Sequence, residues 1–281
     1  MIIDTHNHLW NLATSDLYWL TPELRAAGGP LVHDYLVDDM RAAFATVGVD
    51  RSILVQAWHD PDENERWLEL ASETDIIAGV VSYIDLEGPD VAKLLDRFSA
   101  YPKFRGIRAT GQDVPDDDWL ARADVRAAIR ELATRGEHSL DLLLNIPQLK
   151  GVPRLADENP DLPMVLNHLA KPQTSEEGYF EPWAALMSPL ADIPNLEFKT
   201  SGMLTEAGSN PDSATLRPAV QFMIETYGFK RLMWGSDWPV SLLAGSYKTN
   251  FEVTLGAVGT MTDSQRALLL GGNAKRFYRV V

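Results

Sequence analysis

The sequence predicts an α/β protein of the (β/α)8 class, a TIM-type barrel whose ring need not be regular. The chain has 281 residues, 45% of them hydrophobic and 23% charged, which is enough for one large core. Short apolar runs rich in β-branched residues alternate with longer stretches of helical periodicity, as in repeated βα units. No linker or low-complexity tract interrupts this pattern, so we expect residues 1–281 to form a single barrel domain.

Eight apolar runs have the length and composition of buried parallel strands. Two stretches rich in turn residues, 173–179 and 208–214, are predicted to be exposed loops. The predicted strands lie near residues 2–6, 52–56, 77–84, 106–109, 140–145, 164–167, 196–200 and 231–236.

Helices are predicted between the strands, and two have clear signals. Residues 119–135 carry apolar residues at helical spacing with charged residues on the opposite face. The last helix should begin at Thr262, because Gln265 three places later completes a capping box, and it should run to Tyr278.

Composition narrows the chemistry and the partners. Without cysteine, the chain can hold a metal only through histidine and carboxylate side chains. A formal net charge of −15 repels phosphate backbones and anionic lipids, so we expect a small-molecule substrate and neither nucleic acid nor a membrane as partner. No signal-peptide pattern or membrane-spanning run is present, which predicts a cytoplasmic protein, while a homo-oligomer stays an open alternative.

The active site of such a barrel lies at the carboxyl ends of its strands, and reactive side chains cluster at three of these ends. His6 and His8 end the first predicted strand, and their spacing of two places both imidazoles on the same side. His168 ends the sixth strand and Asp237 follows the eighth. Asp237 is the predicted general base, because burying a carboxylate at an apolar strand end costs free energy and is expected only where the group has a partner or a function.

Each of these residues also has a structural interpretation. A pair of histidines at spacing two can be hydrogen-bonded barrel residues, and a lone histidine such as His168 is more often a satisfied core residue. Asp237 could cap the turn before Pro239. The combination of all four residues at three strand ends favours a functional site.

Several segments together resemble the amidohydrolase superfamily, in particular its amidohydrolase-related (amidohydrolase 2) lactonase branch. The segments are DTHNHLW, GIRA, NHLAKP, FKTSG, GSDWP and GGNAKRFY, and they span nearly the whole chain. This branch includes lactonases of the fucono- and rhamnonolactonase kind and pyrone-dicarboxylate lactonases. The resemblance implies that His6, His8 and His168 polarise a carbonyl or bind a metal, and that Asp237 activates water.

The resemblance also implies that Arg108 faces the substrate, where a guanidinium can pair with a carboxylate or with vicinal oxygens. A structural ion pair is the other interpretation of this residue. Further substrate-binding candidates follow strand ends: Trp10, Gln56, Trp58, Lys171 and Trp238. Ordinary core packing is an equally good explanation for the tryptophans.

Two departures from the pattern of the wider superfamily limit what the resemblance implies about metal ligands and substrate. The bridging lysine and the additional histidine of binuclear members have no counterpart, since the fourth strand offers Arg108-Ala109 and the fifth Asn145-Ile146. Ala109 also replaces the histidine of the common GIRH pattern. Two alternatives therefore stay open for His6, His8, His168 and Asp237: one divalent ion, zinc first among the candidates, or catalysis without metal.

We expect a hydrolase that opens the ring of a small lactone, a sugar (aldono-) lactone first. Asp237 would activate water against a carbonyl polarised by the three imidazoles. Two alternatives remain: a metal-dependent decarboxylase or hydratase of an unsaturated acid, and a non-catalytic sugar-acid binding protein. No G-x-S-x-G, P-loop or G-x-G-x-x-G motif points to serine-hydrolase or nucleotide chemistry.

Overall fold

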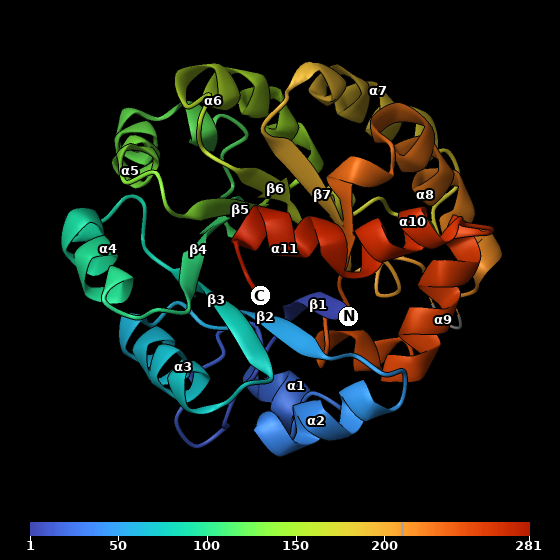
Figure 1. Ribbon diagram of the computed structural model, residues 1–281, viewed down its shortest axis with the longest axis horizontal. Coiled ribbons are helices and arrows are strands. Elements are labelled where there is room, and N and C mark those ends of the chain that lie inside the picture. Colours follow the sequence, from blue (N-terminus) through green and yellow to red (C-terminus); the bar gives the residue numbers. More distant parts are fainter. Residues whose placement is uncertain (209–210) are drawn as a thin grey trace.

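The computed structural model, which describes residues 1–208 and 211–281, confirms the predicted barrel class. Its eight strands are all parallel and pair in chain order within one sheet, and the helices surround this sheet (Figure 1). The strands are β1 (Ile3–Asn7), β2 (Arg51–Val55), β3 (Ile77–Tyr83), β4 (Phe104–Thr110), β5 (Ser139–Leu143), β6 (Met164–Leu166), β7 (Leu196–Thr200) and β8 (Leu232–Trp234).

The ring closes through residues beyond the end of β8. Asn7 and Trp238 form a parallel bridge. The N–H of Asp237 donates to the carbonyl of His6 at 2.7 Å, and the N–H of His8 donates to the carbonyl of Trp238 at 2.8 Å. The seam therefore brings the segment after β8 against the end of β1, where the predicted reactive residues lie.

Most of the helices bury one apolar face, as in α4, where Val91, Leu95 and Phe98 recur at helical spacing. Several begin at a side chain that accepts a hydrogen bond from the first turn: Thr21, Asp60, Asp212, Ser246 and Thr262. The helices are α1 (Pro22–Ala27), α2 (Val37–Ala45), α3 (Pro61–Glu73), α4 (Val91–Ser99), α5 (Ala123–Thr134), α6 (Val152–Glu158), α7 (Phe180–Met187), α8 (Ser213–Tyr227), α9 (Tyr247–Val258), α10 (Asp263–Ala267) and α11 (Asn273–Tyr278).

The structure corrects two predicted elements. The helix expected over 119–135 is interrupted at Arg122, whose ψ of 142° is extended, so a short 3₁₀ turn (Trp119–Ala121) precedes α5. The eighth strand ends at Trp234 and not at residue 236, because the chain leaves the sheet there to close the seam.

Other predicted boundaries are confirmed. The capping box of Thr262 and Gln265 is present, and helical backbone continues to Tyr278 through a π-helical turn (Leu268–Gly272). Residues 173–179 contain neither helix nor strand. Of the predicted loop 208–214, residues 209 and 210 lie outside the described part of the chain, and α8 already begins at Ser213.

One end of the barrel is closed by α11, which crosses it in front of the strands (Figure 1). Phe277 and Tyr278 of this helix pack against Ile3, Ile53 and Met233 of the barrel interior. Apolar side chains thus fill the barrel at this end, and the polar groups occupy the interior above them.

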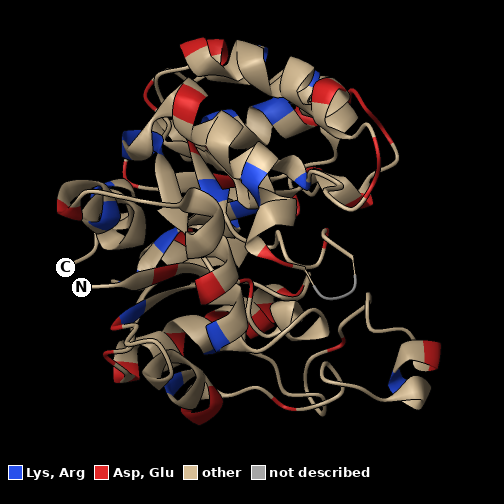
Figure 2. Ribbon diagram, turned by 90° about the vertical axis from the view of Figure 1, so that its right-hand side faces the viewer, with Lys and Arg blue, Asp and Glu red and all other residues tan. Residues whose placement is uncertain are grey.

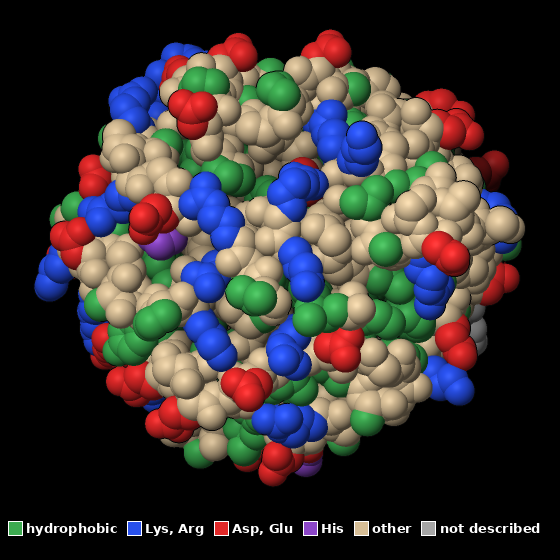
Figure 3. Space-filling model, viewed as in Figure 1, with side chains coloured by type: hydrophobic (Ala, Val, Ile, Leu, Met, Phe, Trp, Pro, Cys, Tyr) green, Lys and Arg blue, Asp and Glu red, His purple; other side chains and the backbone are tan. Residues whose placement is uncertain are grey.

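Both termini lie at the closed end, and the loops that follow the strands gather at the opposite end (Figure 2). Lys and Arg side chains cross the closed end (Figure 3), so the net charge of −15 is spread unevenly over the molecule. Among the helices of the described residues, none combines the length and the apolar character that a membrane crossing requires.

Candidate active site

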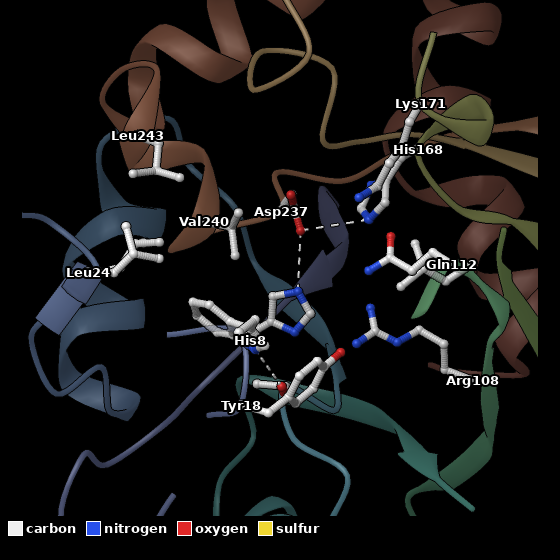
Figure 4. Close-up of a pocket in the computed structure, with 14 residues that line it drawn as sticks. His8, Tyr18, Leu24, Arg108, Gln112, His168, Lys171, Asp237, Val240 and Leu243 are labelled. Atoms are coloured by element: carbon white, nitrogen blue, oxygen red, sulfur yellow. Dashed lines mark hydrogen bonds and ion pairs between the residues drawn. The ribbon is translucent and has the colours of Figure 1, made fainter. Parts of the chain in front are cut away.

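Three imidazoles surround one carboxylate oxygen at the open end of the barrel. Oδ1 of Asp237 lies 3.2 Å from Nε2 of His8, 3.6 Å from Nε2 of His6 and 3.9 Å from Nε2 of His168. All four side chains are buried, and Figure 4 shows His8 and His168 directed at Asp237 from two sides. The structure therefore brings together the four residues that the sequence predicted from three distant segments.

Asp4, which the sequence analysis did not single out, fixes this cluster from below. Its buried carboxylate accepts hydrogen bonds from the N–H of Ser236 at 2.9 Å and from the hydroxyl of Tyr247 at 2.9 Å. It also accepts from the N–H of His6 at 3.1 Å. Burial raises the pKa of Asp4 despite these donors. The residue thus ties β1 to the segment that carries Asp237, and its place at the start of DTHNH was the available signal.

His168 stands on a left-handed turn. The four residues from His168 to Lys171 have φ angles of 51° to 56°, although none is glycine. Such a conformation costs about 1–2 kcal/mol per residue, so the turn must be held by its surroundings. Trp183 of α7 contributes by donating from Nε1 to the carbonyl of Leu169 at 2.8 Å.

Gly202, just after β7, leaves the space that the His168 ring occupies. Its φ is +64°, and a Cβ at this position would lie 2.4 Å from Nδ1 of His168. Only glycine combines this backbone conformation with so close an approach. Gly202, the last residue of the FKTSG segment, therefore belongs to the site because it has no side chain that would displace His168.

Burial sets the protonation states of the cluster. It lowers the pKa of His168 to about 3, although the charge of Asp237 acts in the opposite direction. Burial also holds the pKa of His6 well below its ordinary value. For Asp237, burial works to raise the pKa, but His168 and the hydrogen bond with His8 outweigh it, so the pKa is lowered. At neutral pH, His6 and His168 are neutral and Asp237 is ionised.

The outer nitrogens of the imidazoles have different partners. Nδ1 of His8 donates to the carbonyl of Val55 at 2.9 Å, and its Nε2 is hydrogen-bonded to Oδ1 of Asp237 at 3.2 Å. Nδ1 of His168 lies 2.9 Å from the hydroxyl of Ser201, which can donate to it. Nε2 of His6 is buried and has no hydrogen-bond partner among the described residues.

A pocket of about 330 Å³ opens above the carboxylate. His6 is fully buried and lies behind this pocket, whereas His8, His168 and Asp237 line it. Apolar side chains stand on one side and polar side chains opposite them (Figure 4): Leu24, Val240 and Leu243 face Arg108, Gln112 and Lys171. Further lining residues are Tyr18, Trp19, Leu31, Ala57 and Leu143.

Arg108 reaches the pocket from the end of β4, as the sequence predicted. One of its terminal nitrogens donates to the carbonyl of Gln56 at 2.7 Å, and its buried Nε has no hydrogen-bond partner in the part of the chain that the structure describes. Burial lowers the pKa of the guanidinium. A buried guanidinium with donors to spare is suited to bind oxygen atoms of a substrate.

The other predicted substrate-binding residues, Lys171 excepted, lie outside the pocket lining. Trp10 is buried in the core and donates from Nε1 to the carbonyl of His33 at 2.8 Å. Trp238 packs edge-on against Tyr35, and Trp58 lies against Tyr18. The Gln56 side chain is buried without hydrogen-bond partners. Core packing explains the positions of Trp10 and Trp238, and substrate binding by these four residues stays an unsupported prediction.

Sequence reasoning missed the residues that wall the pocket on its apolar side. Tyr18, Trp19, Leu24 and Leu31 belong to the long segment between β1 and β2, and Leu243 follows β8. The available signal was their position in loops at the carboxyl ends of strands, where such barrels place their binding residues.

The spacing of the donor atoms fits one divalent ion. Donor atoms of His6, His8 and Asp237 all lie within 4.8 Å of one another. Four ligands at about 2.1 Å from a tetrahedral zinc ion stand about 3.4 Å apart. The separations of 3.2 Å and 3.6 Å from Asp237 to His8 and His6 agree with this value.

The fold and this cluster define an amidohydrolase. The chain matches the family model described as Amidohydrolase over residues 3–280 and belongs to that family. An L-fucono-1,5-lactonase from Burkholderia ambifaria is 35% identical over 283 residues, which cover 99% of this chain and 95% of the relative.

Solved structures agree with this assignment. A crystal structure of an amidohydrolase from Burkholderia multivorans with bound HEPES has a TM-score of 0.90 at 30% identity and covers all of both chains. Another crystal structure of an amidohydrolase from this organism, with bound zinc, has a TM-score of 0.88 at 31% identity and the same coverage.

Proposed function

We propose that this protein hydrolyses a sugar lactone to the open-chain acid. The observation that carries the proposal is the position of Oδ1 of Asp237 among three imidazoles, beside a pocket of about 330 Å³. The similarity to L-fucono-1,5-lactonases at 32–35% identity supports a cyclic ester of a sugar acid as the substrate class.

Asp237 acts as the general base in this proposal. Its lowered pKa keeps the carboxylate ionised at neutral pH, and the residue lines the pocket. The carboxylate takes a proton from a water molecule as the water oxygen attacks the lactone carbonyl carbon. His8 supports this step, because its Nε2 lies 3.2 Å from Oδ1 and a proton can be shared between these two atoms.

The negative charge that develops on the carbonyl oxygen requires donors in the pocket. His168 can supply one from Nε2 if the hydroxyl of Ser201 donates to its Nδ1, and Arg108 can supply another. When the tetrahedral intermediate collapses, the ring C–O bond breaks and the proton held by Asp237 and His8 passes to the leaving alkoxide. Water is consumed, and the product is a hydroxy acid.

Two features of the pocket bear on the choice of lactone. Arg108 and Lys171 can bind hydroxyl oxygens of the substrate and the carboxylate of the product. Among the described residues, no other side chain lies at hydrogen-bond distance from their nitrogens, so both have donors left for a ligand. The apolar side formed by Leu24, Val240 and Leu243 suits a face of the ring that carries hydrogens or a methyl group.

A divalent ion, where one is bound, would be held by His6, His8 and Asp237 and would polarise the lactone carbonyl. With or without the ion, Asp237 activates the attacking water, and Arg108 and Lys171 bind the lactone hydroxyls.

A panel of sugar lactones tests the proposal. We expect purified protein to acidify a weakly buffered indicator solution containing 1,5- or 1,4-lactones of six-carbon sugar acids, above the spontaneous rate. The same panel after treatment with a chelator, and again with added zinc, shows whether the activity depends on a metal.

Two results would contradict the proposal. Turnover of an unsaturated dicarboxylic acid, with every lactone inert, would indicate decarboxylation or hydration on the same scaffold. Saturable binding of sugar acids without any turnover would indicate a binding protein.

A further inference from the structure

A buried ion pair lies beneath the imidazoles and has no part in the steps described above. Nζ of Lys199, on β7, is 2.6 Å from Oδ2 of Asp141, on β5, and both side chains are fully buried. Asp141 also accepts hydrogen bonds from the hydroxyl of Tyr278 at 2.9 Å and from Nδ2 of Asn167 at 3.1 Å. With these three donors around it, Asp141 holds the Lys199 ammonium in one place.

Lys199 has a second contact, which reaches the candidate active site. Its Nζ lies 3.4 Å from Nδ1 of His6. An ammonium group has three donors and no acceptor, so Nδ1 of a neutral His6 must be the acceptor of this contact. The ring proton of His6 is then on Nε2, the nitrogen that faces Oδ1 of Asp237 at 3.6 Å.

His8 has the opposite arrangement, although it is only two residues away. Its Nδ1 donates to the carbonyl of Val55, and its Nε2 is the nitrogen that faces Oδ1 of Asp237. This is the usual arrangement of a metal-binding histidine, whose outer N–H donates to a carbonyl or a carboxylate. His6 therefore has the right position for a metal ligand but the wrong outer partner.

Stability alone does not account for the pair. Replacing a buried ion pair by apolar side chains of similar volume is often neutral or stabilising, because two charges must be taken out of water. What Lys199 and Asp141 add at this position is the contact with Nδ1 of His6.

We propose that Lys199, held by Asp141, keeps the ring proton of His6 on Nε2. His6 then donates toward the carboxylate of Asp237, and it can bind a divalent ion through Nε2 only after this proton has been lost or has moved to Nδ1. Lys199 and Asp141 are positioning residues in this sense, because they act on the reaction through His6. The catalytic consequence rests on the proposed function, whereas the proton position and the metal affinity do not.

The proton position can be read directly from the protein. In long-range ¹H–¹⁵N spectra, the protonated and unprotonated ring nitrogens of a neutral histidine resonate far apart. With ¹⁵N-labelled histidine and the His6→Gln variant for assignment, we expect Nε2 of His6 to be protonated in the metal-free protein and Nδ1 of His8 likewise. A spectrum with the proton of His6 on Nδ1 would overturn the proposal.

Zinc affinity gives an independent measurement. In Lys199→Gln, the amide oxygen can accept from Nδ1 of His6 and the amide nitrogen can donate to Asp141, which converts His6 into an ordinary ligand. Because outer partners of ligand histidines change metal affinity by about 10–100-fold, we expect zinc to bind this variant at least tenfold more tightly than wild type.

Lys103→Gln is the matched control. Lys103 is a half-buried lysine that donates to the carbonyl of Thr74 at 2.8 Å, remote from His6. Its zinc affinity should equal that of wild type. Equal or weaker zinc binding by a folded Lys199→Gln protein would contradict the proposal.

A misfolded variant, or failure of the proposed function, can be distinguished from failure of the proposal about Lys199. If Lys199→Gln does not fold, the spectrum of the wild-type protein decides, and Asp141→Asn, which weakens the hold on Lys199, should move the ring proton of His6 partly to Nδ1. If wild-type protein opens no lactone, the proposed function fails, while the spectra and the zinc titrations still test the role of Lys199.

Discussion

The main-chain N–H of Asp237 donates a 2.7 Å hydrogen bond to the carbonyl oxygen of His6. The same two residues meet again through their side chains, where Oδ1 of Asp237 lies 3.6 Å from Nε2 of His6. The position of the proposed base is thus set by the closure of the barrel, and a loop fluctuation cannot move Asp237 without opening the seam between β1 and β8.

Asp237→Asn should lower kcat by about 10²–10⁴-fold, the usual contribution of a general base. The amide retains the shape of the carboxylate but cannot take a proton from water. Asp237 has a φ of +58°, and Asn is among the residues that tolerate this conformation, so the fold should be preserved. Steady-state hydrolysis and thermal unfolding measure the two effects, and normal turnover by the folded variant would exclude Asp237 as the base.

Gly202→Ala should reduce hydrolysis at least tenfold, because the new Cβ would lie 2.4 Å from Nδ1 of His168 and displace the ring. Gly136→Ala is the matched control. Its φ of +69° is positive too, but none of the described residues lies within 4 Å of the added Cβ. Both variants should lose about 1–2 kcal/mol of unfolding free energy. Equal activities of the two would show that His168 does not depend on Gly202.

Arg108→Gln should lower kcat/KM by about 10–100-fold, since a charged hydrogen bond to the substrate contributes about 1.5–3 kcal/mol. Arg105→Gln serves as control, because Arg105 lies on the same strand but donates to the carbonyl of Pro102. That variant should keep the kcat/KM of wild type. An unchanged kcat/KM in Arg108→Gln would place Arg108 outside the substrate site.

Glu63→Gln should stabilise the protein at pH 8 and have little effect at pH 5. Burial raises the pKa of Glu63 to about 7, from its ordinary value of 4.5. The folded state therefore binds more protons than the unfolded state between these values, and stability falls as pH rises from about 4.5 through about 7. At pH 8 the ionised Glu63 thus costs on the order of 3 kcal/mol of unfolding free energy.

Thermal unfolding at the two pH values measures this effect, with Glu177→Gln as control. Glu177 lies exposed in the loop before α7, so its replacement should change stability equally at both pH values. A constant difference between Glu63→Gln and wild type across this range would mean that Glu63 is ionised in the folded state at pH 5.

Sequence periodicity was sufficient to predict the eight strands and the cluster, because both depend on local rules. His6 and His8 follow from the alternation of side chains along β1, and Asp237 from its place after the apolar run of β8. Their meeting in space follows from the common end at which parallel strands of a barrel finish.

Other features depend on contacts between distant segments, which no local pattern records. The left-handed turn at His168 contains no glycine, and the support from Trp183 comes from α7. The break at Arg122 falls within continuous helical periodicity. Leu24 lies in the short helix α1 and Leu243 in a short 3₁₀ helix (Val240–Leu243), so nothing in their spacing indicates that they share a pocket.

The closure of the barrel by α11 has a consequence for the order of assembly. Tyr278 reaches through the apolar layer to Asp141, which in turn holds Lys199 against His6. During synthesis on the ribosome, His6 emerges well before Tyr278, yet its surroundings are complete only after Tyr278 has emerged. A nascent chain that has formed all eight strands would still lack the contact that fixes Asp141 until this helix docks.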